Sequence, residues 1–210
     1  MDSTQTGLQD SRIAFFDAIA DKWDGWQDLP KQERALADML EAFGVRPSET
    51  VADIGCGTGT LTRVLLRRLD AAGRVMAADF SQAMLDRARA KIDDPRVTWL
   101  RASADCMTAI ADGACDRVIC YSAWPHFADP AAVIREFRRI LKPGGTVHIL
   151  HLISREQVNH IHHNASCHAI HHDTLQPVRE VAALFAANEF IITVQIDDSA
   201  RYLLTATKSN

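Results

Sequence analysis

The chain has 210 residues, of which 47% are apolar and 24% are charged, and its net charge is −4. These values are typical of a soluble globular protein, so we expect one domain over residues 1–210. The negative charge and the scatter of basic residues over separate predicted helices disfavour a nucleic-acid partner. The sequence contains no run of about 18 apolar residues, which disfavours a membrane-spanning helix.

The N-terminal residues do not combine a basic region with an apolar stretch, so we expect no signal peptide and a cytoplasmic protein. The five cysteines are scattered and form no C-x-x-C motif, which fits free thiols in a reducing compartment.

Periodicity and turn residues predict an alternating order of helices and strands. Strands are predicted over residues 51–54, 75–78, 97–100, 116–121, 146–152, 191–197 and 202–208. Helices are predicted over residues 13–23, 31–43, 61–69, 82–92, 131–141, 155–172 and 177–187. The alternation predicts a three-layer αβα sandwich with a seven-stranded, mostly parallel sheet. No helix separates the last two strands, so we expect one antiparallel edge strand.

This order divides the predicted domain into three parts. Residues 1–45 form an N-terminal helical lid, residues 46–152 form a ligand-binding core, and residues 153–210 contain a histidine-rich helical segment and the C-terminal hairpin.

The most informative motif is the segment VADIGCGTG at residues 51–59. It predicts a buried strand that ends in a tight bend, because glycine at positions 55, 57 and 59 permits sharp turns and close approach of a ligand to the backbone. Asp79 follows the second strand, 20 residues after Gly59, where a carboxylate can accept both hydroxyl groups of a ribose. The sequence therefore predicts a site for a small molecule that contains a nucleoside.

The spacing G-x-G-x-G, with Asp53 two residues before the first glycine, differs from the G-x-G-x-x-G of dinucleotide-binding folds. It resembles motif I of the class I S-adenosylmethionine-dependent methyltransferases, and the small-molecule members similar to the ubiquinone/menaquinone methyltransferases in particular. The resemblance covers about residues 15–207. It implies a Rossmann-like fold, S-adenosylmethionine as cofactor, and methyl transfer to a small-molecule acceptor.

The resemblance also implies roles for individual residues. Gly55, Gly57 and Gly59 would line the cofactor, Asp53 would hold the methionine ammonium, and Asp79 would bind the ribose. Phe80 or Met84 would pack on the adenine face, although a methionine that faces a helix is more often part of the core. Around the third strand end, Ala104 and Asp105 are expected to contact the adenine, although Ser103 or backbone groups alone are alternatives.

After the fourth strand the chain reads YSAWPHF, which differs from the Asn/Asp-Pro-Pro-Tyr/Phe motif of methyltransferases that act on amines in DNA. Tyr121 and His126 could deprotonate or orient an acceptor. The alternative for His126 is packing against the following helix. The aromatic segment 15–26 resembles the leading helix that covers the cofactor in small-molecule methyltransferases, and it could equally be an amphipathic helix packed on the sheet edge.

Seven of the nine histidines fall between His151 and His172, which suggests a divalent metal such as zinc, iron or nickel. Two ligand sets are possible. Helical spacing favours His160, His163, Cys167 and His171. The inward-facing positions favour His151, His162 and His172, with His126 as a possible fourth ligand, and we predict this second set. Alternatively, the histidines bind the acceptor without a metal.

The sequence is also compatible with two other functions. A non-catalytic metal or ligand sensor on a methyltransferase fold would bind without turnover. An NAD-dependent oxidoreductase would bind its dinucleotide at the same glycine-rich loop, but the third glycine of this chain does not have the spacing of the dinucleotide-binding motif.

Overall fold

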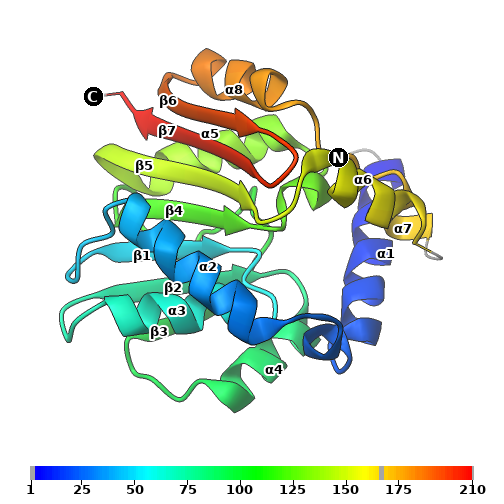
Figure 1. Cartoon of the computed structure of the whole chain (residues 1–210), viewed down its shortest axis with the longest axis horizontal. Coiled ribbons are helices and arrows are strands. Elements are labelled where there is room, and N and C mark those ends of the chain that lie inside the picture. Colours follow the sequence, from blue (N-terminus) through cyan, green and yellow to red (C-terminus); the bar gives the residue numbers. More distant parts are fainter. Residues whose placement is uncertain (1–2, 166–167, 210) are drawn as a thin grey trace.

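The computed structural model describes residues 3–165 and 168–209, and it contains one seven-stranded sheet with helices on both faces (Figure 1). The strands are β1 (Thr50–Ile54), β2 (Arg74–Asp79), β3 (Val97–Arg101), β4 (Cys115–Tyr121), β5 (Leu141–His151), β6 (Phe190–Asp197) and β7 (Tyr202–Lys208). The helices are α1 (Ser3–Ile19), α2 (Leu29–Ala42), α3 (Thr60–Arg68), α4 (Gln82–Lys91), α5 (Pro130–Ile140), α6 (Arg155–His163), α7 (His168–His171) and α8 (Val178–Ala187), with short 3-10 helices at Trp23–Trp26 and Trp124–His126.

The strand order is β3-β2-β1-β4-β5-β7-β6, and only β7 runs against its neighbours. This confirms the predicted mostly parallel sandwich. The reversed strand β7 lies one place in from the edge, which β6 forms, so the C-terminal hairpin folds back between β5 and the edge. The chain moves outward from β1 to β3 and then returns to β4 on the other side of β1. That reversal of strand order creates a crevice beyond the carboxyl ends of β1 and β4.

The two faces of the sheet are covered by different helices, because successive strand residues point to opposite faces. In β1, Val51 packs in an apolar cluster with Leu36 of α2 and Leu65 of α3. Ala52 points the other way, into a second cluster that includes Phe137 of α5 and Phe185 of α8. Figure 1 shows α2 and α3 in front of the sheet, with α5 and α8 behind it.

The histidine-rich segment differs from its prediction. The expected helix over residues 155–172 is interrupted: α6 ends at His163, Asn164 follows it, and α7 is a separate turn. In Figure 1, α6 and α7 lie beside α1, at the end of the sheet where the parallel strands terminate. Residues far apart in the sequence therefore meet at this end. No helix in the described part of the chain is long and apolar enough to cross a bilayer.

The opposite end of the sheet contains a buried network of ionisable groups. Glu49 and Arg117 are 3% and 7% exposed, and the Arg117 Nε lies 3.0 Å from Glu49 Oε2. Arg117 Nη1 also lies 2.6 Å from His148 Nε2. Burial and the Arg117 charge hold the pKa of His148 well below its ordinary value. The neutral imidazole therefore accepts from Arg117, and its Nδ1–H donates to Thr205 Oγ1 at 3.0 Å.

We expect Glu49→Gln to destabilise the protein, because it leaves the buried Arg117 charge without its ionic partner. Removing one partner of a buried pair costs about 3–5 kcal/mol in the free energy of unfolding. Urea denaturation would measure this change. The matched control is Glu156→Gln, at an ion pair whose acid is 64% exposed, where the loss should stay below about 1 kcal/mol. Equal losses at the two sites would contradict the role given to the buried network.

Candidate functional site

The loop that joins β1 to α3 adopts a backbone that only glycine accepts readily. Gly55, Gly57 and Gly59 have φ values of 73°, 52° and 87°, in the left-handed region. Gly59 is the N-cap residue of α3, so the bend leads directly into a helix whose first N–H groups face the crevice. This confirms the predicted strand, bend and helix.

The three glycines have different surroundings. A Cβ on Gly55 would lie 2.4 Å from the Cβ of Ala123, and a Cβ on Gly59 would lie 2.9 Å from the Cδ1 of Ile92. A Cβ on Gly57 would meet no atom within 4 Å among the described residues. The loop is therefore packed against the protein at its two ends and is open at its middle glycine, as a cradle for a ligand requires.

Two buried carboxyl groups flank this loop. Asp53 is 1% exposed, and its Oδ2 accepts from Thr62 Oγ1 at 2.6 Å. Burial raises the pKa of Asp53 to about 7, although the Thr62 hydrogen bond opposes the shift. Asp79 is 9% exposed and accepts from the N–H of Gly57 at 2.8 Å and of Ser81 at 2.9 Å. Burial also raises its pKa, to about 6.

Such perturbed acids in a crevice are typical of binding sites, because a cation or a set of hydroxyl donors can favour the charged form. Asp53 and Asp79 come from adjacent parallel strands, whose carboxyl ends reach the same edge.

The segment 11–26 packs over this end of the sheet. Asp17 accepts from Ser81 Oγ, and Asp24 accepts from Thr58 Oγ1, which lies within the glycine loop. The Phe16 ring makes edge-to-face contacts with Phe80, at a centroid distance of 5.6 Å. The predicted helical cover is thus held to the loop by side-chain hydrogen bonds and to Phe80 by an aromatic contact.

The remaining predicted cofactor residues lie after β3. Ala104 is buried, and Asp105 is exposed within a turn closed by a bridge between Ser103 and Cys106. Contact of Ala104 or Asp105 with an adenine stays a prediction.

His126 lies in a cluster that the sequence predicts only in part. Its Nδ1 is 2.7 Å from Asp173 Oδ2, and its ring centroid is 4.8 Å from that of His162. His162 in turn has its Nδ1 2.8 Å from the backbone oxygen of Asp173. His151, at the end of β5, is 2% exposed and its Nε2 has no hydrogen-bond partner among the described residues.

The charges in this cluster follow from burial. Burial alone would raise the pKa of Asp173, but hydrogen bonds from His126 and Arg12 lower it below its ordinary value. An ionised carboxylate only accepts, so the Nδ1 of His126 carries the proton and Nε2 is the basic nitrogen. Burial lowers the pKa of His151 to about 3, and the neighbouring His126 and His162 act in the same direction.

The predicted metal set finds no support. The described residues contain no group of three or more His, Cys, Asp or Glu side chains arranged to hold a metal ion. His151 and His162 lie near His126, but His172 is exposed and makes an edge-to-face contact with His171. In the alternative set, α6 ends at His163, yet the rings of His163 and His171 lie close together, with centroids 4.9 Å apart, and Cys167 lies outside the described residues.

Tyr121 lies apart from the histidines. It packs with the cluster on the α2 and α3 face, whereas Trp124, next to His126 in the same 3-10 helix, packs on the α5 face. Burial raises the pKa of Tyr121, so its phenol stays protonated and can donate a hydrogen bond rather than act as a base. A direct role for Tyr121 in catalysis remains a prediction.

Three contributors to the site could not be identified in the sequence. Arg12 and Asp173 lie in α1 and after α7, and no motif links them to His126. Ser122, which follows β4, has φ +56°, a strained value for a residue with a side chain. Nothing in the residue types at Tyr121 and Ser122 indicates this backbone conformation.

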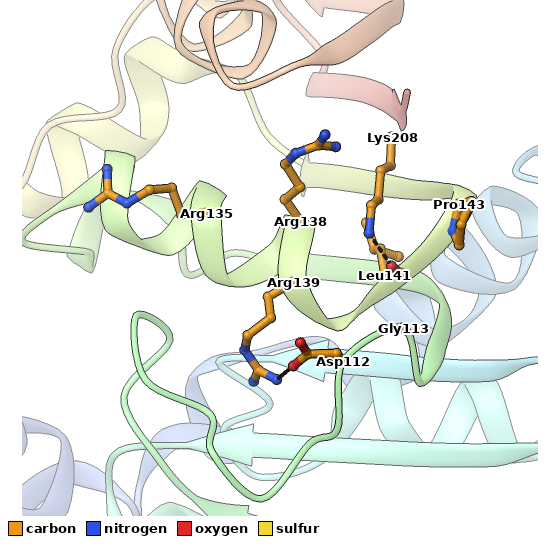
Figure 2. A pocket seen from close by; sticks show the side chains of 8 residues that line it. All are labelled: Asp112, Gly113, Arg135, Arg138, Arg139, Leu141, Pro143 and Lys208. Carbon is orange, nitrogen blue, oxygen red and sulfur yellow. Dashed lines mark hydrogen bonds and ion pairs between the residues drawn. The ribbon is translucent and has the colours of Figure 1, made fainter. Parts of the chain in front are cut away.

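A hollow of about 520 Å³ lies away from these groups (Figure 2). Its lining includes Leu141 at the start of β5 and Lys208 at the end of β7, which is the opposite end of the sheet from the glycine loop. Three of its cations are engaged: Arg139 pairs with Asp112, Arg138 pairs with Glu189, and Lys208 Nζ donates to the Leu141 carbonyl. It contains none of the groups described above.

Residues 51–145 match the family described as methyltransferase domain, and this match spans the glycine loop, Asp53, Asp79 and His126. The chain carries the core of a class I S-adenosylmethionine-dependent methyltransferase. It is 31% identical over 145 residues to 2-phytyl-1,4-naphtoquinone methyltransferase of Trichormus variabilis, covering 65% of this chain and 62% of that protein. It is 30% identical over 149 residues to the ubiquinone/menaquinone biosynthesis C-methyltransferase of Klebsiella pneumoniae, covering 68% and 59%.

Solved structures show the same methyltransferase fold. A putative methyltransferase in complex with the Haloferax volcanii activator Trm112 has a TM-score of 0.73 at 23% identity, covering 93% of this chain and 98% of that chain. The chain spans less than two thirds of the length of the curated relatives that it matches. The match is therefore to the methyltransferase core.

The glycine positions predict a contrast between two substitutions. Gly57→Ala places its methyl group in open space on the ligand side, so we expect a folded protein that loses at least about tenfold in affinity for S-adenosylmethionine, at a backbone cost of about 1–2 kcal/mol. Gly55→Ala meets Ala123 and should lose about 1–3 kcal/mol more in stability. Urea denaturation and titration calorimetry would separate the two effects. Unchanged cofactor affinity in Gly57→Ala would contradict the cradle.

Asp53 predicts a pH dependence of cofactor binding. Its carboxylate attracts an ammonium group and its protonated form does not, so affinity for S-adenosylmethionine should rise as pH increases through about 7. Asp53→Asn should remove this rise and weaken binding at high pH by roughly 10–100-fold, as for a hydrogen bond to a charged group of about 1.5–3 kcal/mol. Calorimetry at several pH values measures it. Asp79→Asn is the comparison: it should weaken binding and keep a rise, displaced below pH 7 because the charge of Asp79 helps to raise the pKa of Asp53. A rise that persists in Asp53→Asn would refute the assignment.

Proposed function

We propose that this chain transfers the methyl group of S-adenosylmethionine to a small-molecule acceptor. The observation that carries the proposal is the open, left-handed loop Gly55–Gly59 between two buried acids, Asp53 and Asp79, at the point where the strand order reverses.

The residues present fit this cofactor. Asp53 is buried without a cationic partner among the described residues, so a methionine ammonium would favour its charged form. The Asp79 oxygens can accept from ribose hydroxyls, and the open space at Gly57 leaves room for the ligand. When bound, S-adenosylmethionine supplies an electrophilic methyl group on a sulfonium and leaves as S-adenosylhomocysteine.

On the acceptor side, we assign the general base to His126. Asp173 holds the imidazole by its Nδ1 and stabilises the imidazolium that forms when Nε2 takes a proton. His151 does not suit this role, because its pKa of about 3 makes it a very weak base and it is enclosed. The ring of Phe16 lies beside His126, and Phe80 packs against Phe16, so the two rings would exclude water from the acceptor.

The acceptor that we propose to test first is a hydroxylated aromatic ring. A base beside the donor matches an acceptor whose O–H must lose its proton before it attacks, and the aromatic side chains suit a flat apolar ring. Two relatives are named as methyltransferases of naphthoquinone and of ubiquinone/menaquinone biosynthesis, which supports this class. The proposal contains no metal step, because the described residues do not form a ligand set.

The test has a binding arm and a turnover arm. Titration calorimetry should register heat with S-adenosylmethionine and none with NADH. A panel of reduced quinones and phenols, incubated with methyl-labelled cofactor, should yield labelled product that mass spectrometry identifies. Binding without turnover on any acceptor would favour a sensor, and heat from NADH alone would refute the methyltransferase.

In the same assay, His126→Gln should lower kcat by about 10²–10⁴-fold, the usual contribution of a positioned base, while affinity for the cofactor stays within about threefold. Tyr121→Phe is the comparison, and it tests whether that phenol orients the acceptor. If His126→Gln kept the kcat of the wild type, His126 would not be the general base.

A further inference from the structure

Arg12 connects the N-terminal helix to the His126 cluster through one carboxylate. Its Nε lies 3.2 Å from each oxygen of Asp173, and its Nη2 contacts Oδ1. The side chains of Arg12, His126 and Asp173 are 14%, 10% and 2% exposed. The three residues come from α1, from the 3-10 helix after β4, and from the loop after α7, so only the folded chain brings them together.

We propose that Arg12 is a positioning residue that fixes Asp173 against His126, so that the acceptor base is complete only while α1 is docked. The inference rests on the proposed function, in which His126 is the base. It assigns a role in the reaction to a residue that lies outside the matched methyltransferase core.

The division of the carboxylate oxygens supports this role. Arg12 Nη2 donates to Oδ1 and Arg12 Nε lies 3.2 Å from both oxygens, so the guanidinium holds the plane of the carboxylate while Oδ2 also faces the Nδ1 of His126. A guanidinium can do this because its donors are fixed in one plane, whereas a lysine offers a single point charge. Held in this way, Asp173 selects the tautomer of His126 whose Nε2 is free of hydrogen.

The charge of Arg12 has a second effect. Asp173 is almost fully buried, and a buried carboxylate stays ionised only with partners. Arg12 supplies a permanent positive charge beside this carboxylate, in addition to the hydrogen bond from His126.

The other groups that face His126 do not supply this function. His162 gives its Nδ1–H to the backbone oxygen of Asp173, and burial lowers its pKa. His151 is neutral as well. Phe16 contributes an apolar edge from α1, and Asp79 adds a negative charge without a hydrogen bond to His126. The carboxylate of Asp173 thus accepts the hydrogen bond from His126, and the guanidinium of Arg12 balances the charge of that carboxylate.

The simpler alternative is that Arg12 only fastens α1 to the protein. A second, more exposed ion pair of the N-terminal segment provides the control: Asp21, just after α1, pairs with Arg87 of α4, with side chains 70% and 52% exposed. Arg87→Gln therefore removes a fastening of the N-terminal segment and leaves Asp173 untouched.

The experiment compares Arg12→Gln, Arg12→Lys and Arg87→Gln in the full chain, with thermal denaturation to verify folding. ¹⁵N NMR of histidine-labelled protein, with His126→Gln to assign the signal, reports the tautomer and titration midpoint of His126 without any need for turnover. In Arg12→Gln we expect loss of the single Nδ1–H tautomer and a midpoint about one unit higher in pH, since a balancing positive charge is lost. The acidic limb of the kcat profile should move in the same direction.

Arg12→Lys should keep the midpoint near that of the wild type but lower kcat, because charge is retained and the planar fork is lost. Arg87→Gln should match the wild type in both NMR readouts. If Arg12→Gln also matches the wild type in both, Arg12 is a fastening only and the inference is overturned, while methyl transfer by the wild type would still stand. If the wild type neither binds nor uses S-adenosylmethionine, the proposed function fails, and the NMR comparison still decides whether Arg12 controls His126.

Discussion

The site depends on the left-handed backbone that closes β1. Two successive N–H groups, those of Gly55 and Cys56, donate to the single carbonyl of Ala78 at the end of β2, at 2.8 and 3.1 Å. This fixes the bend against the neighbouring strand before α3 begins. The geometry requires positive φ, so it can exist only where the side chain is absent. The positions of Asp53, Asp79 and the first turn of α3 all follow from this bend.

The two ends of the sheet use buried ionisable groups in opposite ways. At the end where β1 begins, Glu49, Arg117 and His148 satisfy one another, and the network is complete within the protein. At the end where β1 stops, burial raises the pKa values of Asp53 and Asp79, and neither carboxyl group has an ion pair among the described residues. Unbalanced acids cost stability, and such a cost is characteristic of sites that a ligand completes. The asymmetry marks the functional end of the fold independently of any motif.

The residues proposed to bind the cofactor and those proposed to act on the acceptor are arranged differently. The proposed cofactor groups come from one contiguous β-α-β segment, whereas His126, Asp173 and Arg12 come from three distant segments. The first group lies within residues 51–145, which match the methyltransferase domain, whereas Asp173 and Arg12 lie outside them.

The sequence by itself determined the alternation of strands and helices, the glycine loop and the two acids, because these depend on local periodicity and on backbone conformations that only glycine adopts. It also indicated His126, as a polar residue beyond a strand end. Only the tertiary structure decided which histidines meet: the ring of His126 contacts that of His162, and the ring of His163 lies beside that of His171. It also brought Arg12 to Asp173, a pairing across 161 residues that no local pattern encodes. Helix, strand and turn patterns depend on residues that are close in sequence, whereas the Arg12–Asp173 pair forms only when distant segments pack together.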